Sequence, residues 1–152
     1  MEFFQELMSN RVLITAIMGW FVAQVLKTLI HLIVHKKFEK ERLVGDGGMP
    51  SAHSSTVCAL ATATLLNFGV GSFEFAVTCM LAIIVMHDAM GVRRETGIQA
   101  KRINAMMELL VSMGSDLSAE EKLKELVGHT PFQVLVGGVL GVVVALVTNL
   151  FL

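Results

Sequence analysis

Residues 131–152, PFQVLVGGVLGVVVALVTNLFL, decide the fold of this chain, because they run to the end of the sequence without a charged side chain. A helix needs about 20 mostly apolar residues to cross the hydrocarbon core of a bilayer. Three further stretches have a similar composition: residues 12–35, 52–70 and 73–92. The chain is therefore predicted to be an all-α membrane protein, a polytopic bundle of about four transmembrane helices that forms a single domain over residues 1–152.

The overall composition agrees with a membrane protein. Charged residues make up 16% of the 152 residues and hydrophobic residues 54%, whereas a soluble domain carries about 25% charged residues. Cys58 and Cys79 both fall within predicted spans and form no CxxC pattern, so we expect buried, inert thiols. His31 and His35 share one helix face at a spacing that can bind a metal. No third ligand is apparent, so no metal site is expected.

The distribution of positive charge predicts how the bundle is oriented. With four spans, residues 36–51 and 93–130 lie on one side of the membrane, and they contain ten of the 12 Lys and Arg residues. The positive-inside rule places both segments in the cytoplasm. The N-terminus, the turn at 68–73 and the C-terminus then lie on the opposite side of the cell (inner) membrane.

The largest polar segment, residues 96–128, is predicted to be a helical cytoplasmic insert. Apolar residues recur at helical spacing over residues 97–112, which predicts an amphipathic helix. A capping box at Ser118-Ala-Glu-Glu121 predicts a second helix that ends at Gly128. The Met-rich stripe of the first helix either packs against the membrane surface or the bundle, which we favour, or binds lipid or a partner. Residues 2–10 are expected to form a short interfacial helix.

Gly137 and Gly141 form a small-xxx-small pattern, with Gly138 beside them. Such a pattern lets two helices approach closely. The sequence alone does not say whether the contact lies within one chain or between two. Because four spans are few for enclosing a polar site, we expect a homodimer.

Residues 45–55, GDGGMPSAHSS, carry the strongest functional signal. Glycines let a backbone approach an anion closely, and the N-terminus of a helix favours bound negative charge. His53 falls in the first turn of the following helix, where it can exchange protons near neutral pH. The stretch therefore suggests a phosphate site, against the simpler interpretation of a glycine turn with serine caps.

Three segments deliver polar groups to the same predicted face of the membrane. His53 opens the second span, Asp88, Arg93 and Arg94 follow the third, and His129 precedes the fourth. Arginine binds phosphate through two parallel hydrogen bonds. Two histidines can divide the roles of nucleophile and general acid.

These residues resemble a known family. Pro50-Ser-Ala-His53 is similar to the Pro-Ser-Gly-His motif of the type 2 phosphatidic acid phosphatases, and His129-Thr-Pro-Phe-Gln133 is similar to their third motif. Nearly the whole chain resembles the divergent branch of acid phosphatase/vanadium-dependent haloperoxidase-related membrane proteins.

The resemblance implies that His129 attacks phosphorus to form a phosphohistidine and that His53 protonates the leaving oxygen. It also implies that the phosphoryl oxygens are held by the turn that includes Gly48 and Ser51, together with Arg93 or Arg94. Neither a metal nor a cofactor is implied, and vanadate should mimic the transition state.

The chain departs from the family pattern at three points. Gln133 replaces the aspartate that orients the nucleophilic histidine, and Asp88 is the candidate substitute from another helix. The arginine of the third motif is absent, and Arg93 and Arg94 are its candidate replacements. The first motif is not intact: Arg42 misses its spacing, and Lys27 lies within a span, from which it either reaches the site or snorkels to the surface.

The leading hypothesis is a membrane phosphatase that hydrolyses a lipid-linked phosphomonoester or diphosphate at the cytoplasmic face. Its expected partners are the bilayer and the phosphorylated lipid, with no nucleic acid. One alternative is an anion-binding or transport protein that keeps the phosphate cradle without turnover. Another is a structural membrane protein whose 97–128 segment docks a partner.

Overall fold

A computed structural model of the chain describes residues 2–36, 47–114, 122–125 and 127–151. Six α-helices make up the ordered elements of this part of the chain, which contains no strand. They are α1 (Glu2–Ser9), α2 (Arg11–His35), α3 (Ala52–Phe68), α4 (Phe73–Met90), α5 (Val92–Ser112) and α6 (Pro131–Phe151). The all-α prediction is confirmed, and α1 is the short helix expected over residues 2–10.

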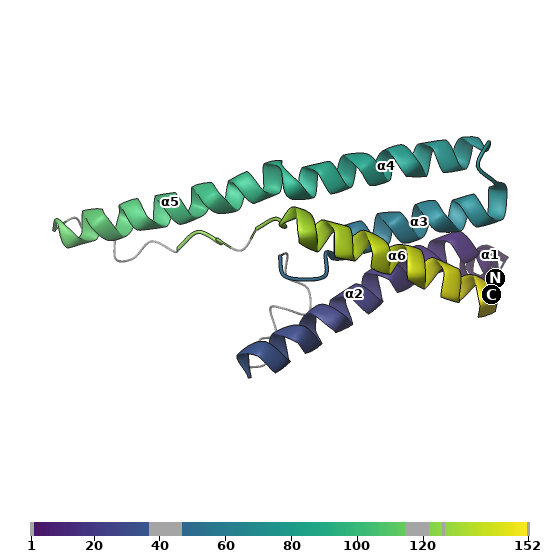
Figure 1. Cartoon of the computed structure of the whole chain (residues 1–152), viewed down its shortest axis with the longest axis horizontal. Coiled ribbons are helices and arrows are strands. Elements are labelled where there is room, and N and C mark those ends of the chain that lie inside the picture. Colours follow the sequence, from purple (N-terminus) through teal and green to yellow (C-terminus); the bar gives the residue numbers. More distant parts are fainter. Residues whose placement is uncertain (1, 37–46, 115–121, 126, 152) are drawn as a thin grey trace.

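Three stretches of helix are long and apolar enough to cross a membrane: Arg11–His35, the apolar part of Phe73–Ser112, and Pro131–Phe151. The fourth predicted span is α3, which has 17 residues. At 1.5 Å per residue it is about 25 Å long, a little shorter than a hydrocarbon core of about 30 Å. It is the central helix, because it packs against α2, α4 and α6 (Figure 1).

Small side chains allow α3 to hold this central position. The buried core consists largely of alanine, including Ala59 and Ala63 of α3 and Ala145 of α6. A Cβ atom at Gly137 or Gly141 would collide with the backbone oxygen of Ser51 or Ser55, respectively. The glycine pattern of α6 is therefore used within the chain, against α3, and the expected homodimer stays a prediction.

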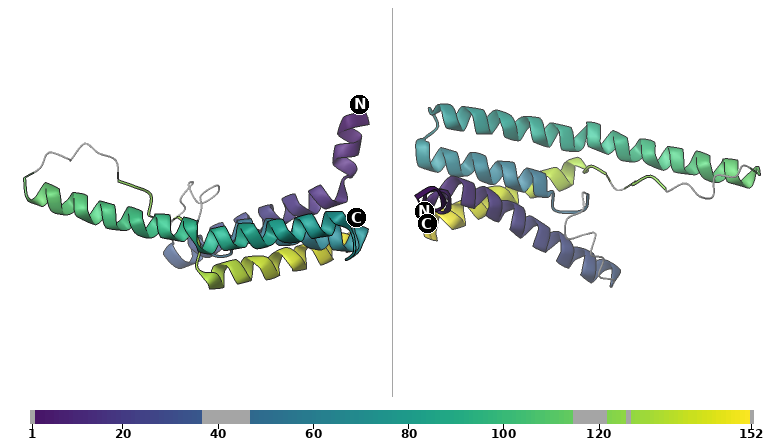
Figure 2. Two further views of the ribbon diagram at one scale, coloured as in Figure 1. Left: turned by 90° about the horizontal axis from the view of Figure 1, so that it is seen from above. Right: turned by 180° about the vertical axis from the view of Figure 1, so that it is seen from behind.

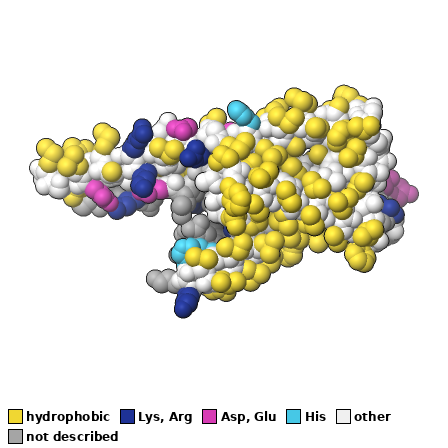
Figure 3. Space-filling view, viewed as in Figure 1, with side chains coloured by type: hydrophobic (Ala, Val, Ile, Leu, Met, Phe, Trp, Pro, Cys, Tyr) yellow, Lys and Arg dark blue, Asp and Glu magenta, His cyan; other side chains and the backbone are white. Residues whose placement is uncertain are grey.

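The two ends of the bundle differ. The N-terminus, the C-terminus and the turn between α3 and α4 lie at one end (Figure 1). The starts of α3 and α6 lie at the other end, as alternating passes require. From there α5 continues beyond the bundle as an arm, roughly in line with α4, from which Gly91 separates it (Figures 1 and 2). Apolar side chains cover the bundle, whereas Lys, Arg, Asp and Glu gather mainly on the arm (Figure 3).

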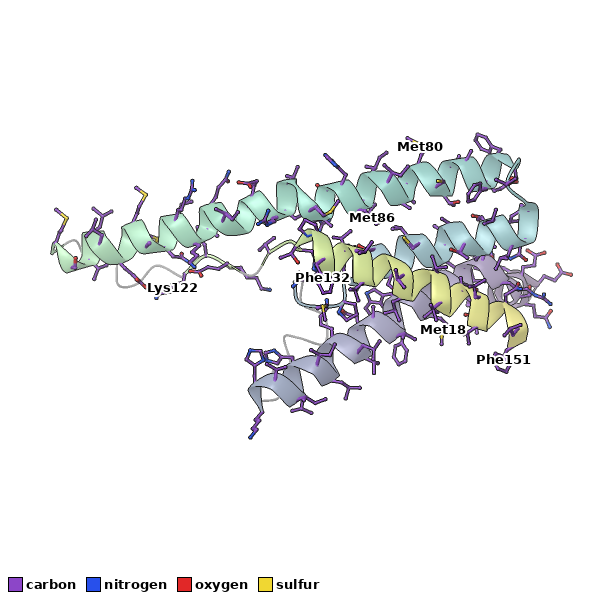
Figure 4. All side chains as sticks on the ribbon, in the orientation of Figure 1. Met18, Met80, Met86, Lys122, Phe132 and Phe151 are labelled. Carbon is purple, nitrogen blue, oxygen red and sulfur yellow. The ribbon has the colours of Figure 1, made fainter. Side chains whose placement is uncertain are left out.

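The predicted insert is only partly correct. The amphipathic helix exists, but it begins at Val92 rather than at residue 97. The prediction of a second helix that ends at Gly128 is wrong for the described residues, because residues 122–125 and 127–130 are not helical. Ser118 and Glu121 lie outside the described residues. The described residues 122–125 and 127–130, which we call the strap, instead return along α5 from Lys122 to the start of α6 (Figure 4).

Candidate functional site

The starts of α3 and α6 are joined at the site. Ser51 caps α3, because its hydroxyl oxygen accepts hydrogen bonds from the backbone N–H of Ser54 at 3.3 Å and from the Ser54 hydroxyl at 3.0 Å. The backbone N–H of Ser51 donates to the carbonyl oxygen of Gln133 at 3.2 Å. Ser51 is fully buried. The hydroxyl of Ser51 is thus engaged in capping, and the contact of its turn with phosphate stays a prediction.

The first turn of α6 is stabilised by a reciprocal pair. The backbone N–H of Thr130 donates to Oε1 of Gln133 at 3.1 Å, and the backbone N–H of Gln133 donates to the Thr130 hydroxyl at 3.3 Å. This is a capping box. The backbone N–H of His129 donates to the carbonyl oxygen of Ala89 at 3.0 Å, which ties the residue to the end of α4. The backbone around His129 is therefore held from two sides.

The two predicted catalytic histidines lie side by side. The ring centroids of His53 and His129 are 6.1 Å apart, with planes inclined at 65°. His129 is only 2% exposed. Among the described residues, its Nε2 atom has no partner with ordinary hydrogen-bond geometry, although the Gly48 backbone lies nearby. The structure thus brings together two imidazoles that are 76 positions apart in the sequence (129 − 53).

The environment of His129 favours its neutral form. Burial lowers the pKa of the imidazole most, and the positive charge of Lys27 and the neighbouring His53 lower the pKa further. The hydrogen bond that His129 donates to Gln133, together with the backbone of Gly48, raises the pKa without reversing this shift. A neutral imidazole has the lone pair that a nucleophile requires.

Arg93 connects the end of α4 to His53. Its Nε atom donates to Oδ2 of Asp88 at 2.7 Å, and its NH1 atom lies 3.5 Å from Nε2 of His53. A guanidinium has only donors, so it faces the lone pair of His53 Nε2. Asp88 therefore holds Arg93. The contacts do not place the Asp88 carboxylate beside His129, where it was expected to replace the missing aspartate. Gln133 occupies that place, with Oε1 at 3.4 Å from Nδ1 of His129.

Lys27 reaches the site rather than the membrane surface. It is 4% exposed, although it is charged and lies in the middle of α2. A Cβ atom at Gly48 would lie 3.5 Å from its Cγ atom. Gly47 and Gly48 both have positive φ angles, of 82° and 79°, which suit glycine. Lys27 and the glycine turn therefore approach His129 together from the side of α2.

A cavity of about 260 Å³ lies beside His129, between α5, the strap and the glycine turn. Arg94 lines it, whereas Arg93 does not, and the phosphate contacts of both residues stay predictions. Sequence reasoning missed Lys101 and Glu125, which also line it. The remaining lining residues are Gly47, Gly48, Gly97, Ile98, Val127, Gly128, Thr130 and Gln133.

Arg42, a predicted phosphate-binding residue, is outside the described residues. The histidine pair of α2 is not among the residues that line the cavity. His31 and His35 stack on each other with ring centroids 4.3 Å apart. They lie in the last turns of α2, where Nδ1 of His35 is 3.3 Å from the carbonyl oxygen of His31.

A family model described as "Divergent PAP2 family" matches residues 8–144, which includes every residue of the site described above. The chain belongs to the divergent PAP2 family. It is also 39% identical over 155 residues to the uncharacterized membrane protein YuiD of Bacillus subtilis (strain 168), a match that covers 96% of this chain and 98% of that protein. No solved structure matches the chain. The family membership and the three apolar helices identify a membrane protein and confirm the resemblance that the motifs suggested.

Proposed function

We propose that this member of the divergent PAP2 family is a phosphatase that hydrolyses a lipid-linked phosphomonoester or diphosphate through a phosphohistidine intermediate. One observation carries the proposal: the Nε2 atom of His129, buried beside His53 and near the Gly48 backbone, has no partner with ordinary hydrogen-bond geometry among the described residues. Leaving a buried polar atom without a partner costs free energy. A nitrogen of this kind, with cationic side chains nearby, is a good candidate to attack a phosphoryl group.

The reaction has two steps. In the first, the lone pair of His129 Nε2 attacks phosphorus, the bond from phosphorus to the lipid oxygen breaks, and protonated His53 gives its proton to that oxygen. In the second, water attacks the phosphohistidine, the P–N bond breaks, and His53 accepts the proton of the water. The products are the lipid alcohol, or the lipid monophosphate from a diphosphate, and inorganic phosphate.

Positive groups surround the phosphoryl oxygens in this proposal. Lys27, Arg93 and Arg94 supply charge, and the turn at Gly47 and Gly48 lets the backbone come close. Arg93 also faces Nε2 of His53 at 3.5 Å. A phosphate that binds Arg93 would draw the guanidinium toward itself and leave this nitrogen able to carry the proton for the leaving group.

The position of the site favours a lipid substrate. The site lies at the end of the apolar bundle where the charged arm begins (Figure 3). A phosphorylated headgroup can enter there while its hydrocarbon tail stays in the bilayer. The excess of Lys and Arg at this end favours the cytoplasmic side of the cell membrane. Labelling of a cysteine introduced at Arg102 in whole cells tests this orientation, since a membrane-impermeant reagent should not reach it.

The test of the proposal is phosphate release from phosphatidate, phosphatidylglycerophosphate and a prenyl diphosphate, with purified protein in detergent. We expect the His129→Ala variant to lose activity, the Arg94→Ala variant to be severely impaired, and the His35→Ala variant, altered at an exposed histidine of α2, to stay active. A phosphohistidine trapped by acid-free quenching should be absent from His129→Ala. Full activity of His129→Ala would refute the nucleophile assignment.

Gln133 also supports a second candidate function. A neutral amide cannot stabilise an imidazolium by charge as a carboxylate does, so the cradle would bind phosphate without turnover. Phosphate-dependent flux in proteoliposomes, with no hydrolysis of any of the three lipids, would identify an anion-binding or transport protein.

A further inference from the structure

The cavity between α5 and the strap is larger than one phosphoryl group requires. Its volume of about 260 Å³ exceeds the roughly 150 Å³ of a protein cavity that holds a benzene molecule. His129 is one of its lining residues, and the Nε2 atom of His129 has no partner with ordinary hydrogen-bond geometry in the described part of the chain. The cavity therefore has room for an anion beside the one that His129 would attack.

The positive charges that line this cavity are arranged along α5. Arg94 and Lys101 both line it and are seven residues apart, which is about two helical turns. At 1.5 Å per residue, Lys101 is about 10 Å farther along α5 than Arg94. The two side chains leave α5 two turns apart, so Lys101 can bind an anion of its own while Arg94 holds the phosphoryl group at His129.

The strap forms the wall of the cavity opposite α5, and contacts with α5 hold the strap in place. The side chain of Asn104, itself 4% exposed, donates to the Leu123 carbonyl oxygen and to Oε1 of Glu125 at 2.9 Å each, and accepts from the Leu123 N–H at 2.9 Å. A Cβ atom at Gly97 would lie 2.7 Å from the carbonyl oxygens of Glu125 and Val127. The cavity is therefore a built feature of the fold, walled by closely packed backbone.

The cavity extends along the arm. Residues 94–101 belong to the part of α5 that leaves the bundle, and the arm carries charged side chains rather than the continuous apolar cover of the bundle (Figures 1 and 3). Figure 4 shows Lys122 of the strap beneath the arm and Phe132 in the first turn of α6. The strap therefore connects the arm to the bundle. An anion beside Lys101 would lie on the water side of His129.

We infer that Lys101 forms a second anion subsite, on the water side of the reaction centre, that binds a phosphate group. The inference rests on the proposed function, in which inorganic phosphate leaves for water while the lipid product leaves into the bilayer. Glu125, on the facing wall, limits the net positive charge, so that the anion is held and released rather than trapped. The group bound is either the released phosphate or a second phosphate of the substrate headgroup.

Two measurements on the full chain in detergent test this inference. The first is calorimetric titration with inorganic phosphate, which needs no turnover. Lys101→Gln should bind phosphate about tenfold more weakly, because it loses a charge-assisted hydrogen bond, and Lys101→Arg should keep the wild-type affinity. Arg102→Gln is the matched control, since Arg102 is an adjacent exposed cation that does not line the cavity.

The second measurement distinguishes the two sources of the phosphate group. It compares the KM of a lipid diphosphate with that of a lipid monophosphate in the same variants. A weaker binding of inorganic phosphate by Lys101→Gln alone assigns the subsite to the released product. If Lys101→Gln instead raises the KM of the diphosphate relative to that of the monophosphate, and inorganic phosphate binds as in the wild type, the subsite is assigned to the second phosphate of the substrate.

Equal behaviour of Lys101→Gln and Arg102→Gln in both measurements would overturn the inference. If no lipid is hydrolysed but Lys101→Gln weakens phosphate binding, the subsite stands and the phosphatase proposal fails. If lipids are hydrolysed but Lys101→Gln matches Arg102→Gln throughout, the subsite fails and the phosphatase proposal stands.

Discussion

The Nδ1 atom of His129 lies 3.4 Å from Oε1 of Gln133, and the same oxygen accepts the backbone N–H of Thr130 at 3.1 Å. A backbone N–H can only donate, so the side-chain atom that it meets must be the amide oxygen. Nδ1 of His129 then carries the proton that points toward this oxygen. In neutral His129 the lone pair is consequently on Nε2, the atom that the proposed reaction requires.

Replacing Gln133 should therefore impair the reaction more than the fold. Gln133→Leu removes the acceptor that selects the tautomer, and we expect phosphate release to fall about 10²-fold, within the range observed for misplaced acid–base groups. Thr130→Ala is the control, because it removes only the hydroxyl that accepts the Gln133 N–H, at a cost of about 1 kcal/mol in stability. Equal activity in the two variants would show that Gln133 acts as a cap alone.

The charge of Lys27 should affect the pH at which His129 becomes protonated. Burial, Lys27 and His53 lower the pKa of His129 below its ordinary value of about 6.5, so the ring stays neutral to a more acidic pH than a solvent-exposed histidine. Lys27→Met removes one positive charge and should raise the pKa of His129, which makes the ring protonate at higher pH. NMR titration of the ring, with exposed Lys36→Met as the control, measures this shift; an unchanged pKa in Lys27→Met would contradict it.

Gly128 should matter both for stability and for the position of His129. It has a φ of +82°, and a Cβ atom there would collide with the backbone of Arg93 and Arg94. Gly69 has a similar φ of +85° with no atom within 4 Å of its Cβ position. Gly69→Ala should therefore lose only the cost of placing a side chain in a backbone conformation that favours glycine (φ 85°, ψ 164°), about 1–3 kcal/mol.

Gly128→Ala should lose about 1–3 kcal/mol more than Gly69→Ala, because the backbone of α5 must move away. Thermal unfolding in detergent measures the difference, and phosphate release shows whether His129 is displaced. Similar melting temperatures for the two variants would mean that the strap does not pack against α5 at this point.

Local patterns in the sequence were sufficient to predict the helices and much of the site. The absence of charge in residues 131–152 predicts α6, and the turn before His53 marks the start of α3, because both signals act over a few neighbouring residues. The strap was not predictable in this way. A capping box and helical composition favoured a helix up to Gly128, but contacts to Asn104 and Gly97 hold an extended path instead.

The same limit applies to individual site residues. The sequence indicates that His53 and His129 meet, because each opens a helix at the same predicted face of the membrane. It does not indicate that Asp88 pairs with Arg93, five residues later across the break at Gly91. It also does not indicate that Lys101 lines the cavity, because that depends on where the strap runs. Lys101 and Glu125 are 24 positions apart (125 − 101) and share no local motif.

The two central glycines of α6 should respond differently to the same substitution. A Cβ atom at Gly141 would collide with the Ser55 carbonyl oxygen of α3, whereas one at Gly138 would lie 3.4 Å from Sγ of Cys58 and 3.6 Å from Cε of Met86. These are ordinary contacts. Gly138→Ala should therefore be neutral or gain up to about 1 kcal/mol from helix preference, whereas Gly141→Ala should lose about 1–3 kcal/mol by overpacking.

Loss of the helical circular-dichroism signal on heating in detergent measures this difference. The comparison also separates the two interpretations of the glycine pattern. If Gly141 packs against α3 within one chain, Gly141→Ala destabilises the protein equally at all protein concentrations. If the pattern instead joined two chains, the loss would depend on concentration and would be accompanied by dissociation, which size-exclusion chromatography would detect. Because the backbone of Ser55 fills the place that a Cβ atom of residue 141 would occupy, we expect the concentration-independent result.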